Sequence, residues 1–436
     1  MGRVWGQDLY FPPVSGETWD TLSPSALGWS DDRLNELYDF LDEKNTKAFI
    51  ILKDGKIVVE WYFDSFTQDS LWYWASAGKT ITAFLVGLAK QEGLLRLEDK
   101  TSDYLGKGWT SCPPEKENLI TLRHQLTMTT GLDDRVADPY NTTPPSLQYR
   151  TDAGMRWAYH NAPYTLLGDV LEAATGMQKN LYTADRLSDR IGMKGLWLQS
   201  GFNSLYISDA RSMARFGLLI QNQGVWDADT LLYDQSYFQS MITPSQDLNR
   251  SYGYLWWLNG QGSYMLPALQ IVFKTDLFPN APADLVAGLG KNDQKLYVLN
   301  SRGLVVVRLG ENAGQLKLAL SSFDNELWGR IMDLYSPTRT AGKKQIHPPD
   351  EFELLQNFPN PFNPSTTLSF HTSAPGHALL EVFNIKGEKV ATLLNHKVDA
   401  GLHRVEFKAN TSPSGVVLFR LTLDDRVSTV KGLKLD

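Results

Sequence analysis

The chain has 436 residues and a formal net charge of −7, and 42% of its residues are hydrophobic while 21% are charged. These values predict a globular protein of two or three domains with a sizeable core. The acidic balance argues against nucleic acid or an anionic membrane as partner, because both need a basic face. The single cysteine, Cys112, excludes an internal disulfide framework and disfavours a cysteine-based metal site. We expect neither a metal nor a cofactor.

No membrane or leader segment is expected in this chain. The longest apolar stretch, around residues 83–89, is too short to span a bilayer. Met1-Gly2-Arg3 is not followed by the apolar run of a signal peptide. A cytoplasmic protein and a mature form that begins behind a new methionine both remain open at this point.

After an N-terminal extension over residues 1–20, the first domain is predicted at residues 21–335. Apolar spacing predicts an early helix over Arg33–Glu43. Asp54-Gly55 separates two apolar runs, which indicates a β-hairpin. The runs cover Ala48–Leu52 and Ile57–Phe63.

Two further helices are predicted in the middle of the domain. The first covers Thr80–Glu92 and ends at Gly93, and the second covers Tyr164–Ala174 and ends at Gly176. Residues 94–160 between them have the pattern of short helices and loops.

Late in the domain, three consecutive strands precede a last helix over Glu326–Tyr335. The strands cover Leu285–Leu289, Gln294–Leu299 and Leu304–Leu309. This order predicts an α+β fold with an antiparallel sheet whose first and last strands come from opposite ends of the domain. The helical middle then forms a second lobe, with a cleft between the lobe and the sheet.

The character of the chain changes near residue 336. Proline, glycine and lysine at 336–350 predict a linker. Six short alternating segments follow between Thr366 and Leu435 without a helical period, so residues 351–436 are predicted to form a small all-β, immunoglobulin-like sandwich.

The segment W-A-S-A-G-K-T at residues 74–80 contains a serine that three chemistries could use. A phosphate loop needs a glycine five residues before Gly78, but that position is Tyr73. A nucleophile elbow needs a small residue two before the serine, and Trp74 stands there. The elbow also needs a histidine base, and neither His124 nor His160 has an evident acid partner.

A Ser-x-x-Lys site fits the segment better. A spacing of three places Ser76 and Lys79 on one face of a starting helix, so the amine can reach the hydroxyl. Lysine acts as a base only when burial or a neighbouring cation lowers its pKa. On this motif alone, a serine that caps a helix, followed by a solvated lysine, is the favoured explanation, because a single Ser-x-x-Lys often occurs by chance.

Further segments give the chain a family resemblance. I-T-L-R-H-Q-L-T-M-T-T-G-L at 120–132, Y-H-N at 159–161 followed by A-P-Y-T-L-L-G, and Y-G-Y-L-W-W at 252–257 occur in order after the serine. Together with the 74–80 segment, this set resembles the serine β-lactamase and penicillin-binding-protein superfamily. The closer likeness is to the class C-like branch, which contains family VIII carboxylesterases and 6-aminohexanoate-oligomer hydrolases. The resemblance covers residues 20–335.

The resemblance implies a β-lactamase/transpeptidase-like fold and a mechanism through an acyl-serine. Ser76 would be the nucleophile, Lys79 its base, and Tyr159 a partner in proton transfer to the leaving group. Asn161 would hold Lys79 or a polar group of the substrate. The backbone N–H groups of Ser76 and Lys291 would bind the oxyanion.

The third family motif differs from the expected pattern. The family has Lys-Thr-Gly or His-x-Gly on a late strand, whereas this chain has Gly288-Leu289-Gly290-Lys291. Gly290 is kept, but the cation that binds a substrate carboxylate is replaced by glycine. We therefore expect a small uncharged ester or amide as substrate. A β-lactamase or D-alanyl-D-alanine carboxypeptidase is one alternative, and an inactive binding module of the same fold is another.

Aromatic residues crowd the same segments, and most of them are expected in the core. Three of them, Trp74, Tyr254 and Trp256, are predicted to line an apolar pocket for the acyl or amide chain.

The last segment resembles a second family. Q-N-F-P-N-P-F-N-P-S-T-T-L at 356–368 and V-K-G-L-K-L-D at the end resemble the C-terminal sorting domain of type IX secretion. This implies export by the type IX machinery to the cell surface or the medium. The four histidines of this region lack metal-ligand spacing and are expected at the surface.

Overall fold

The computed structural model describes residues 9–314, 320–336, 352–355, 357, 360, 362–372, 374–409, 414–424 and 426–435. The chain divides into two compact units, one mainly before residue 313 and the other mainly after residue 337. Of the linker predicted at 336–350, all residues after Ser336 lie outside the described residues. Within the described ranges, no helix has the length and apolar character needed to cross a membrane.

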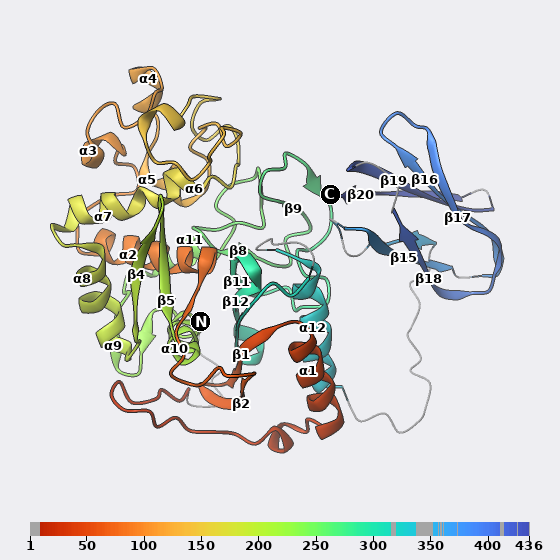
Figure 1. The fold of residues 1–436 in the computed structure, drawn as a ribbon, viewed down its shortest axis with the longest axis horizontal. Helices are drawn as coiled ribbons and strands as arrows, with labels where there is room; N and C mark the ends of the chain where they lie inside the picture. Colours follow the sequence, from red (N-terminus) through yellow and green to blue (C-terminus); the bar gives the residue numbers. More distant parts are fainter. Residues whose placement is uncertain are drawn as a thin grey trace. The chain divides into compact units, whose positions relative to one another are not determined.

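An antiparallel six-stranded sheet forms the centre of the first unit in the described residues (Figure 1). Its order is β2-β1-β13-β12-β11-β8. The strands are β1 (Thr46–Lys53), β2 (Lys56–Tyr62), β8 (Trp257–Leu258), β11 (Leu285–Gly290), β12 (Gln294–Leu299) and β13 (Leu304–Gly310). Ile50 pairs with Val307, so strands from opposite ends of the domain are neighbours. The predicted hairpin and the three late strands are confirmed.

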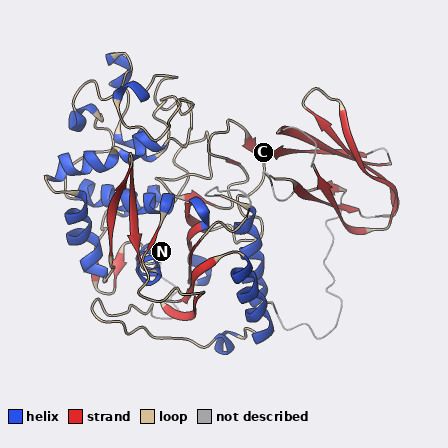
Figure 2. Ribbon diagram, viewed as in Figure 1, coloured by secondary structure: helices blue, strands red, loops and turns tan. Residues whose placement is uncertain are grey.

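Helices pack on both faces of this sheet. On one face, α10 (Ala210–Gln221) comes so close that a Cβ on Gly217 would lie 2.8 Å from Leu296 Cδ1. The next residue of β12, Tyr297, contacts the ring of Trp328 in α12 (Ser322–Leu334). Because successive strand residues point to opposite faces, α12 covers the other face. It lies beside α1 (Asp31–Glu43) in Figures 1 and 2.

The helical lobe is built around α2 (Lys79–Gln91), whose residues from Lys79 to Ala89 are all buried. The predicted helix over Tyr164–Ala174 is present as two helices that meet at Leu166. The lobe and its surroundings contain α3 (Ser102–Leu105), α4 (Pro114–Glu117), α5 (Leu122–Leu126), α6 (Asn161–Thr165), α7 (Leu167–Thr175), α8 (Lys179–Thr183), α9 (Asp189–Ile191) and α11 (Gln235–Met241).

A smaller sheet, which the sequence patterns did not predict, supports the segment before Ser76. Its order is β3-β5-β4, with β3 at Trp72–Tyr73, β4 at Gly195–Ser200 and β5 at Asn203–Ser208. Two short strand pairs complete the unit: β6 (Val225–Trp226) with β7 (Asp229–Thr230), and β9 (Tyr264–Met265) with β10 (Val272–Phe273).

The second unit is an all-β sandwich, as predicted. One sheet has the order β14-β15-β18 and the other β17-β16-β19-β20. The strands are β14 (Glu353–Leu354), β15 (Ser365–Thr372), β16 (Gly376–Asn384), β17 (Lys389–Val398), β18 (Gly401–Lys408), β19 (Gly415–Leu423) and β20 (Arg426–Lys434). Alternate residues of β16 and β19, such as Leu380 and Phe419, are fully buried in one apolar core.

Candidate active site

Ser76 lies on a short turn between a strand and the buried helix α2. Trp74 is fixed before the turn, because its N–H donates to Tyr206 O at 2.9 Å and its indole N–H to Ser208 Oγ at 2.7 Å. Ala75 then takes a left-handed conformation with φ of 48°, which is unfavourable for a residue with a Cβ. This bend places Ser76 in the 3₁₀ turn Ala75–Gly78, where it is partly exposed.

Lys79 reaches Ser76 as the spacing of three predicts. Its Nζ lies 3.0 Å from Ser76 Oγ and 2.8 Å from Asn161 Oδ1. The lysine is only 3% exposed. The Ser76 side chain is therefore partly open to solvent, while the amine beside it is enclosed.

Burial of Lys79 favours the uncharged amine and outweighs the attraction that two neighbouring tyrosine rings offer a cation. The rings of Tyr164 and Tyr159 lie 4.2 and 5.0 Å from Nζ. Burial lowers the pKa of Lys79 to about 7, with a further lowering from the charge of Lys179. At neutral pH a substantial fraction of Lys79 is thus free to accept a proton.

Tyr159, which lies in the loop before α6, also contacts Ser76 and Lys79. Its hydroxyl is hydrogen-bonded with Ser76, which lowers its pKa, but burial is the larger effect and raises that pKa well above the usual value. The ring stacks on Trp257 with centroids 5.8 Å apart. Tyr159 therefore stays a protonated phenol held in one orientation.

Asn161 is the first residue of α6, two positions after Tyr159. Its side chain accepts from Lys79 rather than capping the helix. The structure thus brings together two segments of the chain, one with Ser76 and Lys79 and the other with Tyr159 and Asn161. It adds Tyr164, which the sequence patterns indicated only as a helix residue although it lies three positions after Asn161 on the same face.

β11 passes directly beside the Ser76 turn, and its glycines permit this approach. A Cβ on Gly290 would lie 2.3 Å from Trp74 O, and one on Gly288 would lie 3.0 Å from Thr80 Cγ2. Gly290 is buried, whereas the side chain of Lys291 is exposed. Position 288, where the family carries a cation, therefore presents no side chain.

The turn after β11 is anchored by buried polar groups. Asn292 and Asp293 both have positive φ, 59° and 57°. Arg308, which is fully buried, donates to both of their carbonyl groups at 3.1 and 2.9 Å. Asn292 Nδ2 also donates to the hydroxyl of Tyr73 at 2.8 Å, which ties this turn to the strand before Ser76.

The three residues predicted to line an apolar pocket lie in the core instead. Trp74 and Trp256 are 0% exposed and Tyr254 is 3% exposed. Trp74 contacts the rings of Tyr206 and Phe216. Because these side chains offer no surface to a substrate, they are packing residues, and that part of the site prediction is corrected.

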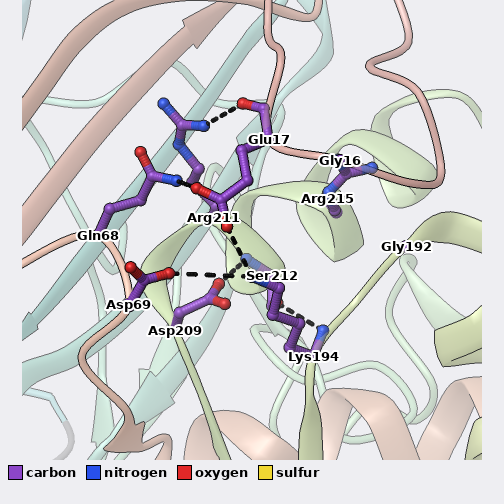
Figure 3. Close-up of a pocket in the computed structure, with 10 residues that line it drawn as sticks. All are labelled: Gly16, Glu17, Gln68, Asp69, Gly192, Lys194, Asp209, Arg211, Ser212 and Arg215. Atoms are coloured by element: carbon purple, nitrogen blue, oxygen red, sulfur yellow. Dashed lines mark hydrogen bonds and ion pairs between the residues drawn. The ribbon is translucent and has the colours of Figure 1, made fainter.

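A small polar hollow lies at another part of the first unit (Figure 3). Its charges pair with each other: Lys194 with Glu17 at 3.0 Å and with Asp69 at 3.9 Å. Arg211 donates to the backbone oxygen of Glu17 at 2.7 Å. These contacts fasten the segment around Glu17 to α10, and we assign the hollow no chemistry.

His160 is buried between Tyr159 and Asn161 but takes no part in their contacts. It is 2% exposed, and both ring nitrogens lack a hydrogen-bond partner in the described structure. Burial lowers its pKa to about 4, against smaller raising effects from Asp134 and Asp133. His160 is therefore a neutral packing residue rather than a base.

This burial makes His160 a source of acid sensitivity. Its pKa falls from about 6.5 in the unfolded chain, so the unfolded state binds an extra proton as the pH drops from about 6.5 to about 4. The native fold should lose up to about 3 kcal/mol over that range through this residue. We expect His160→Phe to lose less stability than the native chain between pH 7 and pH 4.5 in urea unfolding. Equal losses in both proteins would contradict the prediction.

Comparisons with known proteins show the family and the fold of the first unit. Residues 42–311 match the model of the beta-lactamase family, and the chain belongs to that family. No curated protein matches the sequence. Within the described residues, no group of three or more histidine, cysteine, aspartate or glutamate side chains is placed to hold a metal ion.

Solved structures share the fold at low sequence identity. A Bacillus anthracis protein, provisionally named a 6-aminohexanoate-dimer hydrolase, is 18% identical with a TM-score of 0.56, over 76% of this chain and 89% of its own. A penicillin-binding protein homologue from Caulobacter crescentus is 13% identical with a TM-score of 0.54, over 71% and 98%. An octameric penicillin-binding protein homologue from Pyrococcus abyssi is 14% identical with a TM-score of 0.53, over 92% of this chain and 100% of its own.

Proposed function

We propose that the chain is a serine hydrolase that cleaves uncharged carboxylic esters or amides through an acyl-Ser76 intermediate. The observation that carries the proposal is the 3.0 Å contact between Ser76 and Lys79, a buried amine whose pKa is lowered to about 7. An amine in this state accepts the proton of the serine hydroxyl as that oxygen attacks a carbonyl carbon.

The remaining groups have complementary roles in the proposed reaction. The backbone N–H groups of Ser76 and Lys291 bind the oxyanion, each such donor contributing about 3 kcal/mol. Tyr159, still protonated, gives its proton to the leaving alkoxide or amine and regains one from Lys79. Water then adds to the acyl carbon and passes a proton to the same pair. As the bond between Ser76 Oγ and the acyl carbon breaks, that proton moves to Oγ, which releases the carboxylic acid and restores the serine hydroxyl.

The preference for an uncharged substrate is supported by β11. Gly288 stands where related enzymes hold a cation for a substrate carboxylate, and it is packed against Thr80 and Ala77. Tyr140 is 38% exposed and follows Pro139, whose carbonyl oxygen accepts from the N–H of Ala162 at 3.1 Å, so an aromatic residue lies on the segment that contacts the start of α6. Both features favour an ester or an amide with an apolar chain, as in family VIII carboxylesterases or aminohexanoate-oligomer hydrolases of the class C-like branch.

A side-by-side substrate panel tests this preference. We expect short-chain p-nitrophenyl esters to be hydrolysed fastest, an aminohexanoate oligomer more slowly, and nitrocefin least, measured as kcat/KM. The reason is that a β-lactam carries the carboxylate for which β11 has no cation. Nitrocefin turnover above that of the esters would favour the β-lactamase alternative instead.

Covalent labelling separates a hydrolase from an inactive binding module. A fluorophosphonate should add one adduct to the native chain, located at Ser76 by intact mass and peptide mapping. Ser76→Ala is the matched control and should gain none. A native chain without an adduct would support the binding module.

For the second unit we propose a role in export by the type IX secretion machinery, with a destination at the cell surface or outside the cell. The support is the motif resemblance at 356–368 and at the C-terminus, together with the sandwich fold. Fusing residues 351–436 to a reporter in a bacterium with this machinery tests it, and retention of the reporter inside the cell would contradict it.

A further inference from the structure

A second buried lysine lies close to the Ser76 turn, and the reaction described above does not use it. Lys179 begins α8 and is 9% exposed. Its Nζ lies 3.2 Å from the ring centroid of Trp197 and 3.4 Å from Ser204 Oγ. Burying an ammonium group is costly unless its charge is compensated, so the position of this lysine calls for an explanation.

Packing connects Lys179 to the start of α2. Ring atoms of Trp197 lie 3.7 and 3.8 Å from the Cβ position of Gly78, the residue before Lys79. On its other side, Lys179 Nζ lies 3.7 Å from the Cβ position of Gly168 in α7, a helix that packs on α2. Lys179 is thus buried between Trp197 and α7, and both of these pack against the helix that begins with Lys79.

The two lysines face different charges. Around Lys79, the groups that contact the amine are neutral: Ser76 from the turn, Tyr159, and Asn161 and Tyr164 from α6.

Around Lys179, two carboxylates of α7, Asp169 and Glu172, favour the protonated amine. The backbone N–H of Lys179 also donates to Glu172 Oε1 at 2.7 Å. The face of Trp197 also attracts a cation, and it lies 3.2 Å from Lys179 Nζ. The rings of Tyr164 and Tyr159 lie farther from Lys79 Nζ, at 4.2 and 5.0 Å.

We propose that Lys179 is a positioning residue for catalysis: its ammonium group, held on Trp197 behind the Ser76 turn, keeps Lys79 uncharged and able to accept the serine proton. This inference rests on the proposed function, because it assumes that Lys79 is the base. When the pair holds one proton, Trp197 and the α7 carboxylates keep it on Lys179. A second proton on Lys79 is then disfavoured by repulsion between like charges.

The directions of the two pKa values agree with this geometry. The charge of Lys179 is the second cause, after burial, of the lowered pKa of Lys79. Burial also lowers the pKa of Lys179 to about 7, while Asp169 and Glu172 act in the opposite direction. A neighbouring cation is one of the known ways to make a lysine reactive at neutral pH.

The test is the pH dependence of fluorophosphonate labelling at Ser76, measured on the full chain between pH 5 and 9. For the native protein the labelling rate should rise through about pH 7 and reach a plateau. Lys179→Met should move the midpoint upward by about 0.5 to 1 pH unit. Labelling on the acidic limb then falls about three- to tenfold, while the plateau is unchanged.

Three further variants keep the test decisive. Lys179→Arg should retain the native midpoint, because it keeps the positive charge. Lys179→Gln repeats the charge removal if the methionine variant does not fold. Lys194→Met is the control, since Lys194 is an exposed lysine whose side chain is 61% accessible, and its midpoint should match the native one.

An unchanged midpoint in both Lys179→Met and Lys179→Gln would overturn the inference, as would a lowered plateau without a shift, which indicates a structural role. These results would leave the proposed hydrolase function standing. Absence of labelling in the native chain at every pH would overturn both.

Discussion

Replacing Lys79 with methionine is expected to lower kcat/KM for a short-chain p-nitrophenyl ester by about 10³-fold, or about 4 kcal/mol of transition-state stabilisation. Methionine keeps much of the buried volume but removes the amine that lies 3.0 Å from Ser76 Oγ. In the native chain, kcat/KM should rise with pH through about 7, because burial and Lys179 bring the pKa of Lys79 to about 7 and only the uncharged amine acts as a base.

Lys79→Arg distinguishes loss of the base from loss of a hydrogen bond. Arginine still donates hydrogen bonds but cannot release a proton at these pH values, so this variant should be as inactive as the methionine one. Lys90→Met is the matched control, because Lys90 lies on the same helix and pairs with Asp234 instead of Ser76. Substantial ester turnover by Lys79→Arg would remove Lys79 from the role of base.

Gly290→Ala is expected to lower kcat by about 100-fold, the cost of misplacing one oxyanion donor. The added methyl carbon would lie 2.3 Å from Trp74 O, a backbone atom two residues before Ser76. Because two backbones meet at this point, β11 must move away from the turn and carry the N–H of Lys291 with it. Steady-state kinetics on an ester measures the loss.

Gly288→Ala serves as the comparison for Gly290→Ala on the same strand. Its new methyl would meet Thr80 Cγ2 at 3.0 Å, a side-chain atom that is able to shift by a few tenths of an ångström. We expect Gly288→Ala to keep most of the activity. Comparable losses in the two variants, with equal unfolding midpoints, would show that the close approach at Gly290 has no special importance.

The sheet of the first unit and the contact between Ser76 and Lys79 could be predicted from the sequence, because both depend on local patterns. Continuous apolar runs at 285–309 mark strands buried on both faces, and Asp54-Gly55 marks the hairpin. A spacing of three within a helix start fixes the Ser76–Lys79 pair. None of these inferences requires knowledge of distant contacts.

The features that were missed depend on tertiary packing. β3 has only two residues, too few to carry a period-2 pattern, so the strand directly before Ser76 left no signal. Lys179 is 100 positions from Lys79, and nothing in its neighbours indicates burial. Trp256 was predicted to line a pocket but lies in the core. A sequence alone does not distinguish an aromatic residue of the core from one that lines a pocket.

The burial of Lys79 also has a consequence for the energetics of the whole chain. A free lysine keeps its proton up to about pH 10.4, whereas the enclosed one begins to lose it near 7. Folding at neutral pH therefore expels part of a proton and forfeits some stability, which returns as the solution becomes more alkaline. Burial of Lys79 therefore destabilises the native state at the position of the proposed base. An apolar side chain there should give a more stable protein that lacks the proposed activity.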